Sequence, residues 1–407
     1  MSQGPGADTM PEPEATGLGP GRGRTAPLNW PAVQGVRGPM PIIHFVSNRN
    51  VLHESSATGR LLGERFNAGG PQIFRVGAAD VSLAGGNPKD DDNWRVGATK
   101  LYAETLDSRA GKEKLGSARL FEELRVALKD EDRDIVIYIH GFANTFEDSV
   151  RRAASLEHLY SSAGQQVTVV LFSWPSNGRV QPAWDYFSDR EDAEASGLAM
   201  GRALMRLVEF LTHLRQEDQR VVLAARRDGQ VPAKDALRQC TRRLHVLAHS
   251  MGAWALRHAL RKFSELNGGR ITRVVDCVFL MAADEDNDAL HVPLKLQPLG
   301  GLANRIFVYH AANDVALTIS DRTKGMPDRL GSDGPQNLDR LSERVFAIDC
   351  RQVAETQPLH GRHQYFRLRD EVIRDVHATL ADRPQDGRPG REVLRPGRSW
   401  RLAPDRR

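Results

Sequence analysis

The sequence predicts an α/β protein in which buried strands alternate with helices. Runs rich in β-branched and other apolar residues recur along the chain, for example at Asp134–Ile139 and Arg273–Met281, and such runs are typical of buried strands. Segments with the apolar periodicity of amphipathic helices separate these runs, as at Leu115–Leu128 and Ala253–Leu266. Strands that alternate with such helices are typical of the α/β class.

The remaining elements follow from local patterns. A first strand is expected at Pro41–Ser47, where apolar residues dominate. Residues 50–115 are polar and Gly-rich with short apolar stretches, which predicts antiparallel edge strands and loops. A helix is expected to start at Ser188 and to run through Leu214. Residues 224–241 are polar and contain Asp-Gly and Pro, which predicts an inserted loop.

The most informative pattern lies between an apolar run, Leu244–His249, and the helical segment that begins at Ala253. A Ser on a sharp turn between a strand and a helix is the arrangement called a nucleophile elbow. The residues two before and two after the Ser must be small, and here they are Ala248 and Gly252. The pattern predicts Ser250 as the nucleophile of a serine hydrolase. A Ser that only caps the helix is the alternative.

A second turn follows the strand Asp134–Ile139, where His-Gly-Phe precedes a helix that opens with a capping box. In an acyl-transfer enzyme, a backbone N–H at such a strand end can face the developing oxyanion, and Gly141 would keep the approach clear of a Cβ atom. We therefore expect the backbone amides of Phe142 and Met251 to form an oxyanion hole. An ordinary strand-to-helix turn is the alternative.

These motifs, together with the run Val169–Ser176, resemble the α/β-hydrolase superfamily. More narrowly, the chain is similar to a bacterial branch of esterase/lipase-like serine hydrolases. The resemblance spans residues 40 to 380 and is strongest from Asp134 to His363. It implies a mostly parallel central sheet flanked by helices, and a catalytic triad of Ser, acid and His in that chain order.

The order implied by the resemblance places the acid at Asp314, after the second strand that follows the elbow, and the base at His363, after the last strand. The chemistry requires these types, because a Ser hydroxyl needs an adjacent imidazole to take its proton, and a carboxylate orients that imidazole. Asp284 and Asp286 follow the preceding strand and are alternative acids. His360 is an alternative base.

Two features are expected to shape the substrate pocket. Trp174 and Ser176 stand at a strand end, where ligand crevices form in open α/β sheets, so they are candidates to line it. A packed aromatic at a sheet edge is the alternative for the Trp. Residues 176–198 form either a lid over the site or a connecting loop. The aromatic residues of such a lid would be Trp184, Tyr186 and Phe187.

No cofactor and no metal are expected. The sequence contains no Gly-rich phosphate or dinucleotide loop, and His360 and His363 lack a third ligand at zinc-like spacing. His140 and His249, beside the two turns, are expected to be structural. The expected ligand is a small acyl ester.

Composition predicts three segments. Residues 1–40 contain 8 Gly and 7 Pro without a period, which predicts a disordered arm. Residues 41–382 form the hydrolase domain. Residues 383–407 carry 8 Arg against 3 acidic residues, a net +5 in a chain of net +4, and are expected to form a disordered basic tail. A solvated tail gives no reason to expect a specific nucleic-acid partner.

No run of about 18 apolar residues predicts a membrane span, and no secretory signal is visible. Three scattered cysteines are expected to be reduced thiols in a cytoplasmic protein. The expected activity is cleavage of a carboxylic ester or related acyl bond through an acyl-enzyme. An acyltransferase with the same triad and a non-catalytic binding or scaffold protein are the alternatives, and the oligomeric state stays open.

Overall fold

The computed structural model describes Met1 and residues 41–405 except for several internal segments. These segments are 59–60, 104, 108–111, 130, 163, 180–183, 232–242, 315, 318–327 and 355–358. The predicted N-terminal arm therefore lies outside the described residues, apart from Met1.

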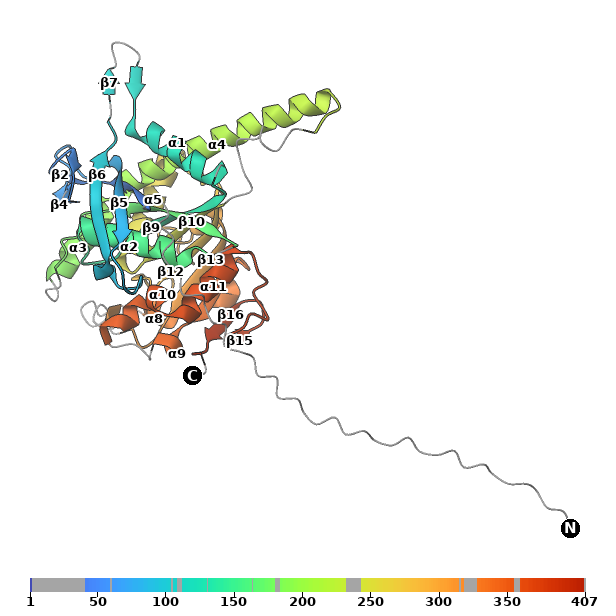
Figure 1. The fold of residues 1–407 in the computed structure, drawn as a ribbon. Coiled ribbons are helices and arrows are strands. Elements are labelled where there is room, and N and C mark those ends of the chain that lie inside the picture. Colours follow the sequence, from blue (N-terminus) through green and yellow to red (C-terminus); the bar gives the residue numbers. More distant parts are fainter. Residues whose placement is uncertain are drawn as a thin grey trace. The chain divides into compact units, whose positions relative to one another are not determined.

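One large sheet forms the centre of the fold (Figure 1). Its twelve strands among the described residues are, in spatial order, β15 (Arg391–Arg395), β16 (Ser399–Leu402), β14 (Val345–Asp349), β13 (Ala303–His310), β12 (Val275–Met281), β11 (Leu244–His249), β9 (Arg133–Ile139), β10 (Gln166–Ser173), β1 (Ile42–Ser47), β5 (Arg75–Leu83), β6 (Trp94–Leu101) and β3 (Ser55–Ser56). Two short ribbons pair β2 (Arg49–Val51) with β4 (Leu62–Phe66), and β7 (Thr105–Asp107) with β8 (Lys112–Lys114).

The strands from β16 to β1 are mutually parallel. At one edge β5, β6 and β3, and at the other edge β15, each pair antiparallel with the next strand inward in the sheet. This arrangement confirms the predicted α/β-hydrolase fold with its mostly parallel sheet. The antiparallel strands within residues 50–115 and the first strand near residues 41–47 are confirmed as well.

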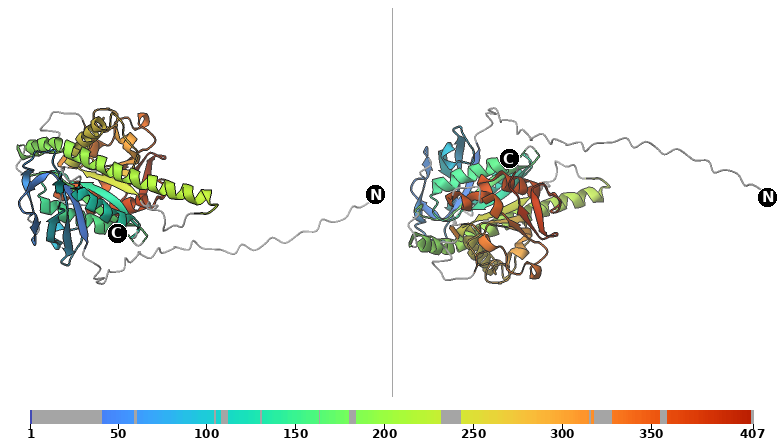
Figure 2. Two further views of the ribbon diagram at one scale, coloured as in Figure 1. Left: turned by 90° about the horizontal axis from the view of Figure 1, so that it is seen from above. Right: turned by 90° about the horizontal axis from the view of Figure 1, so that it is seen from below.

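Helices cover both faces of the sheet (Figure 2). They are α1 (Gly116–Lys129), α2 (Phe146–Tyr160), α3 (Trp184–Ala195), α4 (Gly197–Arg227), α5 (Met251–Leu266), α6 (Leu299–Leu302), α8 (Leu330–Asp333), α9 (Arg351–Ala354), α10 (Tyr365–Leu368) and α11 (Asp370–Leu380). In β9, Ile135 and Ile139 pack in the cluster with α1, α4 and α5, whereas Val136 and Tyr138 pack in the cluster with α2 and α11. The side chains of β9 thus alternate between the two faces of the sheet, as expected for a strand that is buried on both faces.

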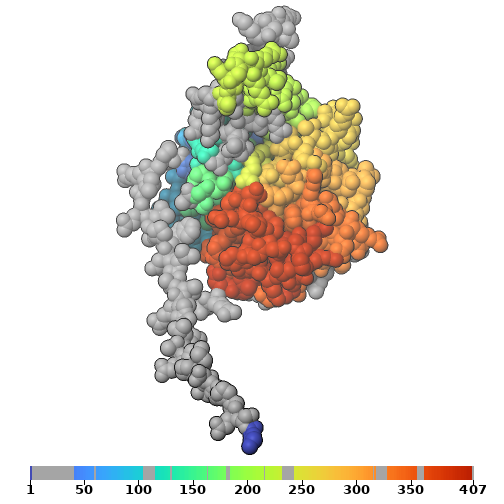
Figure 3. All heavy atoms as spheres, turned by 90° about the vertical axis from the view of Figure 1, so that its right-hand side faces the viewer, coloured from blue at the N-terminus to red at the C-terminus, as the bar shows by residue number. Residues whose placement is uncertain are grey.

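The prediction of a disordered C-terminal tail is wrong. Residues 391–402 form β15 and β16 at one edge of the sheet, and Figure 3 shows the C-terminal end as part of the surface of the body. Trp400 is fully buried, and Arg391 lies over its ring while its guanidinium binds Asp375 in α11. Composition alone predicted a disordered basic tail because Asp375, the carboxylate that pairs with Arg391, lies outside residues 383–407.

The expected single helix from residue 188 to 214 is two helices, α3 and α4, separated at Ser196. Gly197 and Gly201 allow α4 to pack closely against α5. A Cβ atom on either residue would lie within about 3 Å of α5, so only Gly permits this approach. The helix also extends to Arg227, into the predicted loop. Among the helices of the described part of the chain, none is long and apolar enough to cross a bilayer.

Candidate active site

The two predicted turns meet at the middle of the sheet. Strands β9 and β11 are neighbours, although β10 lies between them in the chain, and β10 pairs with the other side of β9. The strand order therefore reverses between β9 and β11, and the crevice at the carboxyl ends of such strands is where open α/β sheets bind ligands. The turn after Ile139 and the turn after His249 both lie at this point.

Ser250 occupies the sharp turn between β11 and α5. Its φ is 53° and its ψ is −125°, a strained conformation that costs about 1–3 kcal/mol in a non-Gly residue. Three backbone hydrogen bonds hold it: its N–H donates to the Met281 carbonyl at 3.0 Å, and its carbonyl accepts from the N–H groups of Asp284 at 3.1 Å and Ala253 at 3.0 Å. A Cβ atom on Gly252 would lie 2.4 Å from the Ile139 carbonyl oxygen, so the turn requires Gly there. This is the backbone geometry of a nucleophile elbow.

The His140–Asn144 turn passes directly over the elbow. A Cβ atom on Gly141 would lie 2.9 Å from the Ser250 Cβ, which leaves room only for Gly. Among the described residues, no hydrogen bond is formed by the Phe142 amide, and Met251, the first residue of α5, has no intrahelical acceptor for its N–H. Two amides beside Ser250 are thus available to an oxyanion.

His363 and Asp314 lie together. The Nδ1 atom of His363 donates to Oδ2 of Asp314 at 2.6 Å, and Asp314 is fully buried. The other carboxylate oxygen of Asp314 accepts from the Ala316 N–H at 3.1 Å. Burial alone would lower the pKa of His363, but the charge and the hydrogen bond of Asp314 raise that pKa above its ordinary value. One carboxylate therefore both orients the His363 imidazole and stabilises its protonated form.

His249 connects this pair to the elbow. Its Nε2 donates to the His363 carbonyl at 3.1 Å, and the centroids of the two imidazole rings lie 4.7 Å apart. Burial and the neighbouring His363 hold the pKa of His249 well below its ordinary value, so this ring is neutral. It is a packing residue that sets the position of His363 next to the Ser250 turn.

The alternative acids have other partners. Asp284 is buried and accepts from the Tyr186 hydroxyl at 2.5 Å, while Asp286 pairs with Arg329 at 3.0 Å and with Lys295 at 2.9 Å. The charge of Asp284 raises the pKa of His363 as well, but less than the charge and the hydrogen bond of Asp314 do. His360 lies in the same 3₁₀ turn as His363, and its side chain is outside the described part of the structure.

Trp174 and Ser176, which were expected to line the substrate pocket, are packed inside the fold instead. Both are fully buried. Trp174 stacks on His140 at 4.9 Å between ring centroids and donates from Nε1 to the His140 carbonyl. The Ser176 hydroxyl donates to Asp189 and accepts from the Asn144 N–H. Trp174 and Ser176 therefore hold the two ends of the His140–Asn144 turn by hydrogen bonds.

The segment 176–198 contains α3, which lies beside the turn. Tyr186 packs edge-on against Phe142, with 5.8 Å between ring centroids, and binds Asp284. Trp184 and Phe187, however, are 85% and 41% exposed. Of the three aromatic residues expected to cover the site, only Tyr186 packs toward it.

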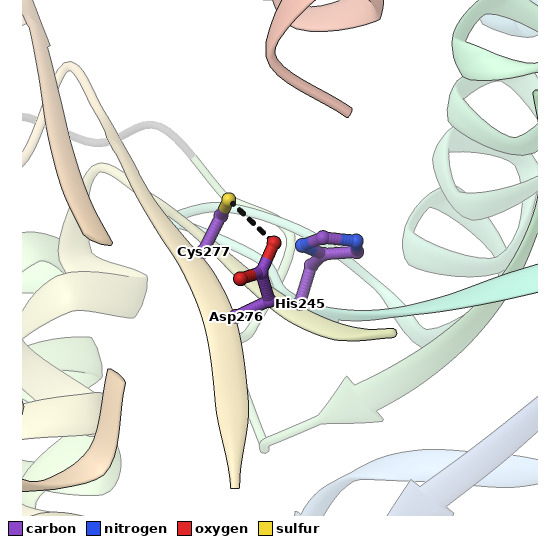
Figure 4. A group of neighbouring side chains, drawn as sticks. All are labelled: His245, Asp276 and Cys277. Carbon is purple, nitrogen blue, oxygen red and sulfur yellow. Dashed lines mark hydrogen bonds between the residues drawn. The ribbon is translucent and has the colours of Figure 1, made fainter. Parts of the chain in front are cut away.

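A separate group of potential metal ligands occurs on β11 and β12 (Figure 4). The ligand atoms of His245, Asp276 and Cys277 all lie within 4.8 Å of one another. The Asp276 carboxylate already accepts from Arg305 at 2.7 Å, and His245 Nε2 donates to Asp134 at 3.2 Å. Because a guanidinium occupies the carboxylate, we assign no metal to this group.

The sheet, the elbow and the reversal in strand order define an α/β hydrolase. The chain belongs to a family described as an alpha/beta hydrolase of unknown function (DUF900), which matches residues 117–243 and 234–383. No curated protein and no solved structure matches the chain.

Proposed function

We propose that the protein is a serine hydrolase that cleaves a carboxylic ester or a related acyl bond of a small molecule. Ser250 is the nucleophile, His363 the general base, Asp314 the acid that orients it, and the amides of Phe142 and Met251 the oxyanion donors. One observation carries the proposal: His363, bound to Asp314 at 2.6 Å, packs against His249, the residue that directly precedes the strained Ser250 at the elbow.

The roles follow from the hydrogen bonds. Because Nδ1 of His363 donates to Asp314, the lone pair of His363 is on Nε2, which accepts the Ser250 hydroxyl proton. The Ser250 oxygen then attacks the acyl carbon, and the two amides bind the resulting oxyanion. Collapse of this intermediate expels the alcohol, which takes the proton from Nε2. Water, deprotonated by the same Nε2, attacks the acyl-enzyme. As the acid leaves, Nε2 returns this proton to the Ser250 oxygen.

The test is hydrolysis of a series of p-nitrophenyl esters by the full chain. Ser250→Ala and His363→Ala should each lower kcat by at least about 10³-fold. Ser264→Ala on α5 and His213→Ala on α4, a side chain 65% exposed, are matched controls that should keep full activity. Retention of the rate in both active-site variants would contradict the mechanism.

An acyltransferase would use the same residues. Product analysis with an added alcohol separates the two activities, because an acyltransferase forms the new ester in preference to the free acid. A scaffold protein would show no turnover with any acyl donor.

Cys277 and Cys350 are free and buried, which supports the proposal of a cytoplasmic location.

A further inference from the structure

Two charged side chains are fully buried behind the His140–Asn144 turn. Arg49 comes from β2 and Asp189 from α3, and both have no exposed surface. Neither residue was singled out from the sequence. Burying a charge is costly unless hydrogen bonds compensate for the lost water, so the partners of these two groups show what the charges do.

Arg49 holds the turn and the end of β10 through neutral acceptors. Its Nη2 donates to the Asn144 carbonyl at 2.8 Å, its Nη1 to the Ser176 carbonyl at 3.0 Å, and its Nε to the Ser173 hydroxyl at 2.9 Å. Burial lowers the pKa of Arg49 to about 9, an effect that the charge of Asp189 partly offsets, so the guanidinium is charged at neutral pH. Its fixed fork of donors therefore fastens the end of the turn to the end of β10.

Asp189 holds the same turn through its carboxylate. Its carboxylate accepts from the N–H of Ala143 at 3.2 Å, from the N–H of Asn177 at 3.2 Å, and from the Ser176 hydroxyl. Ala143 directly follows Phe142 and has a φ of 56°, in the left-handed region that non-Gly residues rarely adopt. The hydrogen bond to Asp189 thus fixes a strained peptide one residue from the predicted oxyanion donor.

We propose that Arg49 and Asp189 are positioning residues that hold the Gly141–Asn144 turn so that the Phe142 N–H faces the oxyanion. This inference rests on the proposed function. It makes α3 part of the catalytic scaffold, because Asp189 on that helix orients the turn. An oxyanion hole acts through donors fixed before the reaction, and a displacement of about 1 Å can cost as much as 100-fold in rate.

The test compares Arg49→Lys and Asp189→Asn with wild-type protein. A Lys ammonium cannot reach three separated acceptors, and an Asn amide places N–H groups where Asp189 accepts. Arg133→Lys and Glu157→Gln are matched controls, because this pair also links a charged arginine to a carboxylate that accepts a backbone N–H. Arg133, the first residue of β9, pairs with Glu157 at 3.0 Å, and Glu157 accepts the Val169 N–H of β10. Circular dichroism and urea unfolding establish that each variant is folded at the assay temperature.

The measurements are kcat and KM for an ester, and the inhibition constant of a boronic acid, whose adduct on Ser places an oxygen in the oxyanion hole. We expect Arg49→Lys and Asp189→Asn to lower kcat by about 10- to 100-fold with KM nearly unchanged, and to weaken boronic acid inhibition similarly. The control variants should change neither quantity, even if they unfold more easily.

Equal kcat and equal inhibition in folded Arg49→Lys and Asp189→Asn would overturn the inference while leaving the proposed function standing. A parallel loss in the control variants would also overturn it, because the effect would then be general destabilisation. Absence of turnover and of boronic acid binding in the wild-type protein would instead reject the proposed function itself.

Discussion

Asp314 and His363 are 49 positions apart in the chain, yet the Asp314 carboxylate accepts a 2.6 Å hydrogen bond from the His363 imidazole. The acid follows β13, and the imidazole stands in the 3₁₀ turn Leu359–Gln364, after β14. The contact fixes which ring nitrogen is free to act as a base. Four predictions concern this contact, the elbow and the C-terminal strands.

Replacing the acid should damage activity without unfolding the protein. Asp314→Asn removes the charge that stabilises the imidazolium and lets the ring take the wrong tautomer, so kcat should fall by about 10³- to 10⁴-fold. Steady-state kinetics beside circular dichroism provide the measurement. Asp284→Asn is the control, with a much smaller expected loss. The reverse order of the two losses would make Asp284 the acid.

The pH profile should report the raised pKa of His363. The base must be neutral to accept a proton, so kcat/KM should rise with pH through an apparent pKa above 6.5 and be lost at lower pH. In Asp314→Asn the larger raising effects, those of Asp314, are absent while burial and the smaller effect of Asp284 remain, so the residual activity should titrate at lower pH. An unchanged midpoint in that variant would contradict the assigned cause.

The elbow should not tolerate a side chain at Gly252. The added Cβ atom in Gly252→Ala would meet the Ile139 carbonyl oxygen at 2.4 Å, which must displace the turn. We expect a loss of about 1–3 kcal/mol in the free energy of unfolding, measured with urea, and a large fall in kcat. Gly300→Ala, where no atom lies within 4 Å of the added carbon, is the control. Wild-type stability and activity in Gly252→Ala would show that the turn is looser than described.

The C-terminal strands should contribute to stability. Trp400 is fully buried beside Arg391 and Phe346, so Trp400→Ala should lower the free energy of unfolding by about 3–5 kcal/mol. Val393→Ala, at a side chain 47% exposed, should have little effect. If both variants unfold like the wild-type protein, residues 391–402 do not pack as described.

The parts of the site that could be predicted are those that short patterns determine. The elbow needs a strand, a Ser between small residues and a helix, all within about 20 positions around Ser250, so the sequence displays it directly. Asp314 and His363 could be named because the resemblance supplied their order along the chain. The structure brings these two side chains together, and their catalytic roles remain predictions.

The failures involve contacts between distant segments. Trp174 and Ser176 stand at a strand end, but the packing of Trp174 on His140 and the bond from Ser176 to Asp189 bury them. Arg49 was missed because its acceptor Asn144 lies 95 positions away, and one isolated charge gives no local pattern. A buried charged residue becomes recognisable only after the fold has identified its partners.

The central claim is an activated Ser250, and labelling of the purified full chain with a fluorophosphonate probe tests it most directly. We predict that mass spectrometry locates one adduct on Ser250, and that Ser250→Ala and His363→Ala abolish it while Ser264→Ala does not. A folded wild-type protein that stays unlabelled, or that carries the adduct on another residue, would contradict the assignment of Ser250 as the nucleophile.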